Sequence, residues 1–234
     1  MPQLLHYSLD PFSRRIRLML GELGIEADIL EEKPWERREE LLLLNPAGAL
    51  PIFVEDDQTL IVGVESLADY LEETRCVLGA GGSMPRTLLG RTPLERAETR
   101  RLVAWFDVKF YREVSRLILM EKIERRLAPP GKGGGPTNMN AVRAALNNIR
   151  PHLDYIGTLA EHRNWLAGDE LTQADLAAAA HLSCLDYLGD VPWGVNAYAK
   201  AWYQRIKSRP SFRPLLADHI RGMPPPRIYA DLDF

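Results

Sequence analysis

Short apolar runs alternate with amphipathic segments along the first third of the chain. Apolar residues recur every three or four positions over 12–23, which predicts a helix, and Gly24 is a suitable residue to end it. A second short helix should end before Pro46, because the residue preceding a proline avoids helical torsion angles. The predicted element order is β-α-β-α-β-β-α. Its members are strands at 4–7, 27–30, 52–54 and 60–62 and helices at 12–23, 37–44 and 66–73.

Beyond a glycine-rich stretch, the predicted elements are all helices. Residues 92–95 (TPLE) and 172–175 (TQAD) are capping boxes, in which two side chains satisfy backbone donors that the first helical turn leaves free. An apolar stripe runs from Met139 to Ile156, and Pro151 should kink that helix. A last helix is predicted over 198–208. The chain thus divides into an N-terminal α/β domain (1–78), a linker (79–91), an all-helical domain (92–221) and an extended acidic-aromatic tail (222–234).

The composition is that of an ordinary globular protein in a reducing compartment. The 234 residues include 29 basic and 32 acidic side chains, so the formal net charge is −3 and the basic surplus of a nucleic-acid-binding protein is missing. Two cysteines exclude a disulfide scaffold, and the five histidines lack metal-ligand spacing. The N-terminus does not resemble a signal peptide, and the apolar runs are too short to span a bilayer. We therefore expect a cytoplasmic protein without a metal, without nucleic acid and without direct membrane insertion.

Four motifs in the same order resemble those of the glutathione S-transferase superfamily. The resemblance extends over 4–216. It implies a thioredoxin-like N-terminal domain followed by an all-α C-terminal domain, and a two-fold homodimer. The element order predicted above agrees with that fold without using the resemblance. The motifs are DPFSRRIR (10–17), NPAGALP (45–51), VESLADYL (64–71) and LAGDELTQADLAAAAHL (166–182).

The resemblance implies a glutathione site of which the reactive half has been lost. Pro51 would be a cis-proline beside the cysteinyl unit of glutathione, and Glu65 and Ser66 would meet its γ-glutamyl group. Asp10 occupies the position at which many relatives carry a catalytic serine or cysteine. A carboxylate has an ordinary pKa of about 3.9, so it is ionised, only accepts hydrogen bonds and raises the pKa of a neighbouring thiol. We therefore expect a vestigial site with no catalysis and no cofactor, in which Ser66 and Pro51 could serve only to cap a helix and shape a loop.

An enzymatic alternative stays open. Ser13 or Tyr7 could supply the hydroxyl that Asp10 lacks, because some classes of the superfamily use a tyrosine at the end of the first strand. The chain would then be a glutathione-dependent transferase or reductase, with glutathione as its ligand.

Two features are not explained by the fold. Trp35 stands among charged residues in EEKPWERREE, either as a ring folded over its own loop or as a binding anchor, since tryptophan is enriched at binding hot spots. The tail PRIYADLDF follows three prolines and could pack back on its own domain or present aromatic and acidic groups to a partner. Under the second interpretation, which we favour, Trp35 and the tail lie close together. The candidate partner-binding residues are Trp35, Arg227, Ile228, Tyr229, Asp231, Asp233 and Phe234.

Trp35, Asp10 and the terminal ADLDF together resemble one branch of the superfamily, which serves bacterial cell division by binding FtsZ. The resemblance implies a non-catalytic homodimer that binds FtsZ polymers at the division site, promotes their curvature or bundling and supports constriction. A two-fold dimer carries two copies of any patch and can therefore bridge two sites on filaments.

Overall fold

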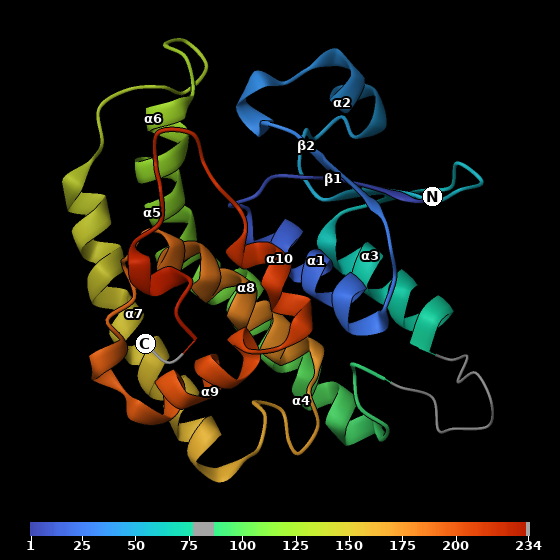
Figure 1. Ribbon diagram of the computed structural model, residues 1–234, viewed down its shortest axis with the longest axis vertical. Helices are drawn as coiled ribbons and strands as arrows, with labels where there is room; N and C mark the ends of the chain where they lie inside the picture. Colours follow the sequence, from blue (N-terminus) through green and yellow to red (C-terminus); the bar gives the residue numbers. More distant parts are fainter. Residues whose placement is uncertain (77–86, 233–234) are drawn as a thin grey trace.

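The N-terminal part of the chain forms a mixed four-stranded sheet, in a computed structural model that describes residues 1–76 and 87–232. The strand order is β2-β1-β3-β4, with β1 parallel to β2 and the other pairs antiparallel. Helices α1 (Pro11–Leu23) and α3 (Val64–Leu71) lie on one side of the sheet, and α2 (Glu39–Leu44) lies on the other (Figure 1). The strands are β1 (Gln3–His6), β2 (Asp28–Glu31), β3 (Ile52–Val54) and β4 (Leu60–Val62).

Helix α1 begins and ends where the sequence predicts. The Asp10 carboxylate accepts the backbone N–H of Ser13 at 2.8 Å, which satisfies a free donor of the first turn. Gly24 follows the helix with a φ of 67°, a left-handed conformation that glycine adopts without a steric penalty. The buried side of α1 packs against α8 (Gln173–Tyr187), and this contact joins the α/β part to the helical part.

The second part of the chain is helical. Segments η3 (Trp105–Ser115) and η4 (Met120–Glu124), which are π-helical, join three helices into one path that reaches Leu127 as predicted. Helix α7 continues through Pro151 without interruption. Helix α8 is buried along its whole length, as expected of a helix that is apolar on all sides. The remaining helices are α4 (Pro93–Ala104), α5 (Arg116–Leu119), α6 (Arg125–Leu127), α7 (Met139–His162), α9 (Ala197–Lys207) and α10 (Arg213–Leu216).

The predicted element order is confirmed, with two local differences. Helix α3 begins at Val64 after Gly63, so Ser66 lies within the first turn and does not cap the helix. The second predicted helix is shorter than 37–44, because a 3₁₀ turn, η1 (Pro34–Glu36), precedes α2 and Arg37 between them has a φ of 47°. Residues 79–86 of the predicted linker lie outside the described residues.

The C-terminal segment returns over the helical part of the molecule. After α10 it rises beside α5 and α6 and then descends, so that its last described residues lie near α7 and α9 (Figure 1). A short helical turn, η7 (Arg227–Tyr229), interrupts the extended path that the sequence predicts. Within the described ranges 1–76 and 87–232, no helix combines the length and apolar character that crossing a membrane requires.

Candidate functional site

Asp10 and Ser13 form a closed pair at the start of α1. The Ser13 hydroxyl is fully buried and donates to the Asp10 carboxylate at 2.6 Å, while it accepts the Tyr7 backbone N–H at 3.3 Å. Burial raises the pKa of Asp10 to about 6, against the hydrogen bonds from Ser13, which lower it. The carboxyl group is therefore mostly ionised at neutral pH. It accepts the hydrogen bond from Ser13 that a thiolate at this site would otherwise accept.

Tyr7 lies at the end of β1 and supports Trp35. The two rings meet edge to face with their centroids 5.1 Å apart. The Tyr7 side chain is buried, and among the described residues its hydroxyl has no hydrogen-bond partner. Burial, followed by the nearby charge of Glu31, raises the pKa of this phenol, so Tyr7 keeps its proton at neutral pH.

The residues expected to meet the peptide part of glutathione keep the arrangement that the resemblance implies. The Leu50–Pro51 peptide bond is cis. The Glu65 carboxylate accepts a hydrogen bond at 2.9 Å from Arg15, which is buried, and Ser66 is exposed in the same turn. The cis-proline, the Arg15–Glu65 contact and the exposed Ser66 are thus observed, and the binding of glutathione by these residues stays a prediction.

Arg15 belongs to a buried polar network that we did not predict from the sequence. Its guanidinium pairs with Asp107 and donates to Gln173 at 2.8 Å. Asp107 in turn contacts His181 at 3.1 Å, and His181 contacts Ser115 at 2.9 Å. The network is made from three helices distant in sequence, so a local motif could not reveal it.

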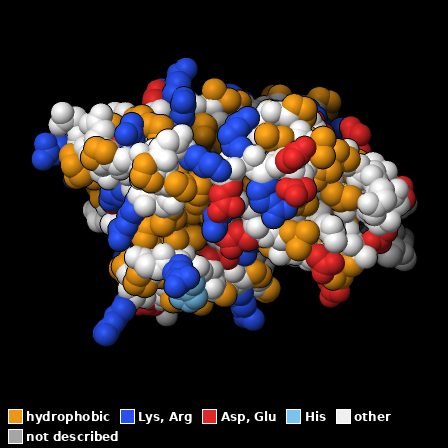
Figure 2. Space-filling view, turned by 90° about the horizontal axis from the view of Figure 1, so that it is seen from above, with side chains coloured by type: hydrophobic (Ala, Val, Ile, Leu, Met, Phe, Trp, Pro, Cys, Tyr) orange, Lys and Arg blue, Asp and Glu red, His pale blue; other side chains and the backbone are white. Residues whose placement is uncertain are grey.

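A cavity of about 400 Å³ opens beside Trp35, between the α/β part and the helical part. A second, smaller cavity of about 60 Å³ lies on the other side of Tyr7 and reaches Asp10. Seen from this end of the molecule, basic side chains are more frequent over the helical side and acidic ones over the α/β side (Figure 2). The residues lining the larger cavity are Tyr7, Glu31, Lys33, Trp35, Glu36, Leu127, Pro129, His219, Ile220 and Arg221.

Tyr229 is not an exposed anchor, and the prediction that it binds a partner directly is wrong. Its side chain has no exposed surface, because the ring packs on Tyr187 at a centroid distance of 5.2 Å and the hydroxyl lies between Arg14 and the Leu215 carbonyl. Its neighbour Ile228 is 45 % exposed.

The rest of the tail is only partly described. Arg227, Asp231 and Leu232 are exposed, whereas Asp233 and Phe234 lie outside the described residues. The structure brings Trp35 beside 219–221, the residues just before the predicted tail, and the Ile228 carbonyl accepts a hydrogen bond from Lys207 of α9. Residues 219–221 could not be predicted to lie there, because that segment carries no recognisable motif.

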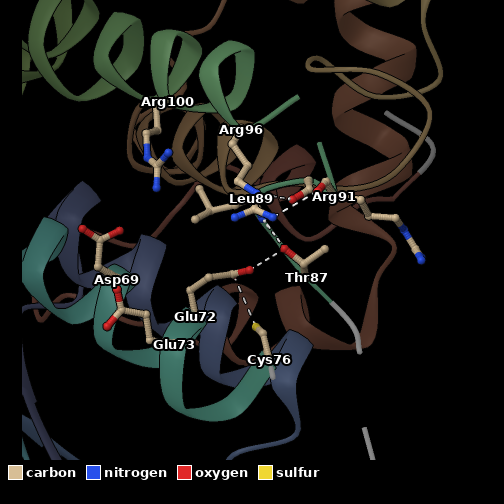
Figure 3. Close-up of a pocket in the computed structure, with 10 residues that line it drawn as sticks. Asp69, Glu72, Glu73, Cys76, Thr87, Leu89, Arg91, Arg96 and Arg100 are labelled. Carbon is tan, nitrogen blue, oxygen red and sulfur yellow. Dashed lines mark hydrogen bonds between the residues drawn. The ribbon is translucent and has the colours of Figure 1, made fainter. Parts of the chain in front are cut away.

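A further cavity, of about 480 Å³, separates the end of α3 from the start of α4. Its walls carry opposite charges, with Asp69 on α3 and Glu73 on the π-helical turn η2 (Glu72–Cys76) that follows it, and with Arg96 and Arg100 on α4 (Figure 3). Glu72, between the two acidic residues, is buried. In the described part of the chain, neither this region nor any other gathers three or more side chains that could hold a metal ion.

Comparison with known proteins places the chain in a family. The model of the glutathione S-transferase N-terminal domain matches residues 4–76. FtsZ-localized protein A of Caulobacter vibrioides is 44 % identical over 232 residues, which cover 98 % of this chain and 96 % of that protein. The crystal structure of a glutathione S-transferase from Sinorhizobium meliloti is 46 % identical with a TM-score of 0.94, and both chains are covered completely. The structure of FzlA from C. crescentus is 44 % identical with a TM-score of 0.90, covering 100 % of this chain and 99 % of that one. The chain therefore belongs to the glutathione S-transferase superfamily.

Proposed function

We propose that this chain is a non-catalytic member of its superfamily that associates with FtsZ at the division site, promotes filament curvature or bundling and supports constriction. The observation that carries the proposal is the 44 % identity to FtsZ-localized protein A across 98 % of the chain. A relationship of that extent includes the surfaces of the protein as well as its core. The S. meliloti protein, whose structure is described as a glutathione S-transferase, has a similar sequence identity to this chain. Sequence identity alone therefore does not distinguish a binding protein from an enzyme, and the residues of the site must be considered.

The Asp10–Ser13 pair supports a role without catalysis and without a cofactor. Activation of a thiol requires a group that donates a hydrogen bond to the thiolate or withdraws its proton. The Ser13 hydroxyl is already spent on Asp10 at 2.6 Å, and the negative charge of Asp10 disfavours a second anion beside it. The chemistry of this position thus favours the use of the fold as a binding scaffold.

The surface around Trp35 is the proposed docking site for FtsZ. Trp35 is partly exposed and lines a cavity together with the apolar Leu127 and Ile220. Charged residues of both signs line it as well, with Lys33 and Arg221 opposed by Glu31 and Glu36, and Lys33 pairs with Glu36 at 3.3 Å. An aromatic anchor in an apolar depression with charged neighbours is the usual composition of a binding hot spot. We refer to the surface formed by Trp35, Leu127, Ile220, Lys33 and Arg221 as the Trp35 surface.

The exposed part of the tail would add a second contact to the same partner. Ile228 and Leu232 are 45 % and 41 % exposed, and Asp231 beside them is exposed as well. With Asp233 and Phe234, they would supply apolar and acidic groups that complement a surface of opposite charge. Arg227 is exposed at the start of this stretch.

Co-sedimentation with FtsZ polymers assembled in GTP tests the proposal. The intact protein should pellet with polymers, and Trp35→Ala should weaken its apparent affinity at least about tenfold, as expected for a hot-spot residue. Tyr198→Ala is a matched control, because Tyr198 is an aromatic residue that is 51 % exposed on α9. Failure of the intact protein to pellet would refute the function, and equal pelleting of Trp35→Ala would refute only the docking site.

The proposed homodimer has a candidate interface at the cavity between α3 and α4. Asp69 and Glu73 occupy one wall, and Arg96 and Arg100 occupy the other (Figure 3). A patch with its acidic half on one side and its basic half on the other is self-complementary under two-fold rotation, since each half meets the opposite half of a second copy. We propose that a second copy of the chain docks here and that the dimer presents two Trp35 surfaces to FtsZ.

A charge exchange tests this interface. One variant carries Asp69→Arg and Glu73→Arg, and the other carries Arg96→Glu and Arg100→Glu. Each should sediment as a monomer, because like charges would face each other twice. An equimolar mixture should form heterodimers, in which both contacts join opposite charges again. Dimers in either variant alone, or monomers in the mixture, would contradict the proposed interface.

One observation favours the enzymatic alternative. Tyr7 lines both cavities, and its buried hydroxyl, which has no partner among the described residues, could donate to the sulfur of a bound glutathione. Retention on glutathione resin and a thiol-conjugation assay decide between the two functions. Turnover that is lost in Tyr7→Phe or Ser13→Ala would establish a transferase or reductase.

A further inference from the structure

Tyr229 connects the end of the chain to the interior through one buried side chain. Its hydroxyl accepts a hydrogen bond from Arg14 Nη1 at 3.2 Å and donates one to the Leu215 carbonyl at 2.8 Å. Neither Tyr229 nor Arg14 has exposed surface. Removal of the hydroxyl would therefore leave Arg14 with a donor that water cannot readily satisfy.

Arg14 divides its other donors among three distant segments. Nε donates to the Ser8 carbonyl at 2.6 Å, Nη1 also donates to Ser183 Oγ at 2.8 Å, and Nη2 pairs with Asp218 at 3.1 Å. A guanidinium group is planar, so its donors have fixed relative directions. A displacement at the Tyr229 side is thus transmitted to the Ser8 side.

Ser8 lies in the turn between β1 and α1, next to Tyr7. The Asp10 N–H donates to the Tyr7 carbonyl at 3.0 Å and closes this turn between β1 and α1. The ring of Tyr7 is the one against which Trp35 packs edge to face. A continuous series of contacts therefore runs from Tyr229 through Arg14 and the turn to Trp35.

The segment around Tyr229 is attached to the helical part by the Tyr229 ring, which packs on Tyr187, and by the Ile228 carbonyl, which accepts a hydrogen bond from Lys207 at 3.3 Å. Ile228, Ala230 and Asp231 expose surface on either side of Tyr229. The hydrogen bond between the Tyr229 hydroxyl and Arg14 supplies the contact with α1. A partner that binds the exposed residues can therefore act on α1 through Tyr229.

We propose that Tyr229 is a positioning residue that orients the Trp35 surface through Arg14, so that the tail and the Trp35 surface are coupled although Tyr229 itself touches no partner. The effect on partner binding rests on the function proposed above. The effect on the orientation of Trp35 does not, because it is a property of the protein alone.

The test compares Tyr229→Phe with the intact protein by ¹⁹F NMR after incorporation of 5-fluorotryptophan. The Trp35 resonance is assigned by its absence in Trp35→Phe. Tyr229→Phe should shift or broaden that resonance and leave the Trp165 resonance in place, and hydrogen exchange of the Asp10 amide should become about fivefold faster, as expected for one lost hydrogen bond. Tyr198→Phe, which alters an exposed ring on α9, should leave both measurements unchanged.

The outcome separates positioning from general support of the fold. If Tyr229→Phe lowers the melting temperature while the Trp35 resonance and the exchange of Asp10 stay as in the intact protein, the proposal is overturned. Asp218→Asn loosens the same guanidinium from its other side and should produce the same two changes, so it provides the test if Tyr229→Phe does not fold. Altered Trp35 signals with normal FtsZ co-sedimentation would leave the coupling intact and count against the proposed docking site.

Discussion

Asp10 and Ser13 are joined by two hydrogen bonds, from the backbone N–H at 2.8 Å and from the hydroxyl at 2.6 Å, to the same carboxylate oxygen. The first bond caps α1, and the second occupies the only serine hydroxyl in the first turn of the helix. One side chain thus stabilises the helix and removes a candidate catalytic donor. The residue that the resemblance aligns with a nucleophile caps a helix in this chain.

At neutral pH, Asp10→Asn should be more stable than the parent. This difference in the free energy of unfolding should be smaller at acid pH. Because burial raises the pKa of Asp10 to about 6, its charged form is disfavoured in the folded state, and stability from this group falls as pH rises from about 4 to about 6. An amide still accepts the Ser13 N–H and carries no charge. The gain above pH 6 should reach about 3 kcal/mol, since the pKa rises by about two units and one unit corresponds to about 1.4 kcal/mol. Urea unfolding at pH 4.5 and 7.5 measures it, and an equal difference at both values would contradict the prediction.

His6→Gln should remove a pH dependence of the opposite sign. His6 is buried in β1, and its pKa is lowered to about 4, first by burial and then by the charge of Arg17. The unfolded chain binds this proton more tightly, so stability is lost as pH falls from about 6.5 to about 4. The parent should lose about 3 kcal/mol more than His6→Gln over this interval. Parallel unfolding free energies for the two proteins at pH 7 and pH 4.5 would show that His6 does not titrate in this way.

Local patterns in the sequence predict the elements of this fold better than its buried polar contacts. The αL glycine after α1 and both capping boxes were predicted from a few adjacent residues, because their partners lie within one helical turn. The burial of Arg14 and of Tyr229 could not be predicted in this way. They are 215 positions apart, and neither DPFSRRIR nor PRIYADLDF carries a sign that the two side chains meet.

The same limit applies to the candidate site. The cis bond before Pro51 and the place of Asp10 at the start of α1 agree with the motifs that suggested them. The cavity beside Trp35 depends on Ile220 and Arg221, which approach it only because the C-terminal segment folds back over the helices. A chain that folds back over a long distance shows no periodic pattern in its sequence. The place of Ile220 and Arg221 at this cavity could therefore not be predicted.

Asp107→Ala should destabilise the protein far more than a double variant in which its partner Arg15 is replaced as well. Arg15 is fully enclosed and pairs with Asp107, so removal of the carboxylate leaves a buried guanidinium poorly compensated. Loss of one partner of a buried ion pair costs about 3–5 kcal/mol. The double variant Arg15→Met with Asp107→Leu removes both charges and should be less destabilised than Asp107→Ala. Chemical denaturation of the parent and the two variants gives the comparison, and a double variant no more stable than Asp107→Ala would contradict the prediction.

The two capping boxes should differ in their contribution to stability, although their sequences are alike. Glu95 accepts the N–H groups of Arg91 and Thr92 at an exposed helix end, where water can replace it, so Glu95→Ala should lower the stability only slightly. Asp175 does the same for Thr172.

Asp175 also makes contacts beyond its own helix. Its side chain is fully buried and accepts the Leu166 N–H at 2.8 Å and the Trp202 indole N–H at 2.9 Å, in addition to the Thr172 N–H. Asp175→Ala leaves three buried donors without their acceptor and should cost at least about 3 kcal/mol, since each unsatisfied donor costs about 1–3 kcal/mol. Urea denaturation of both variants measures the two losses. Similar losses would mean that Asp175 only caps its helix and that the contacts with Leu166 and Trp202 add little, whereas a larger loss at Asp175 would identify it as a link between α8, α9 and the loop that precedes them.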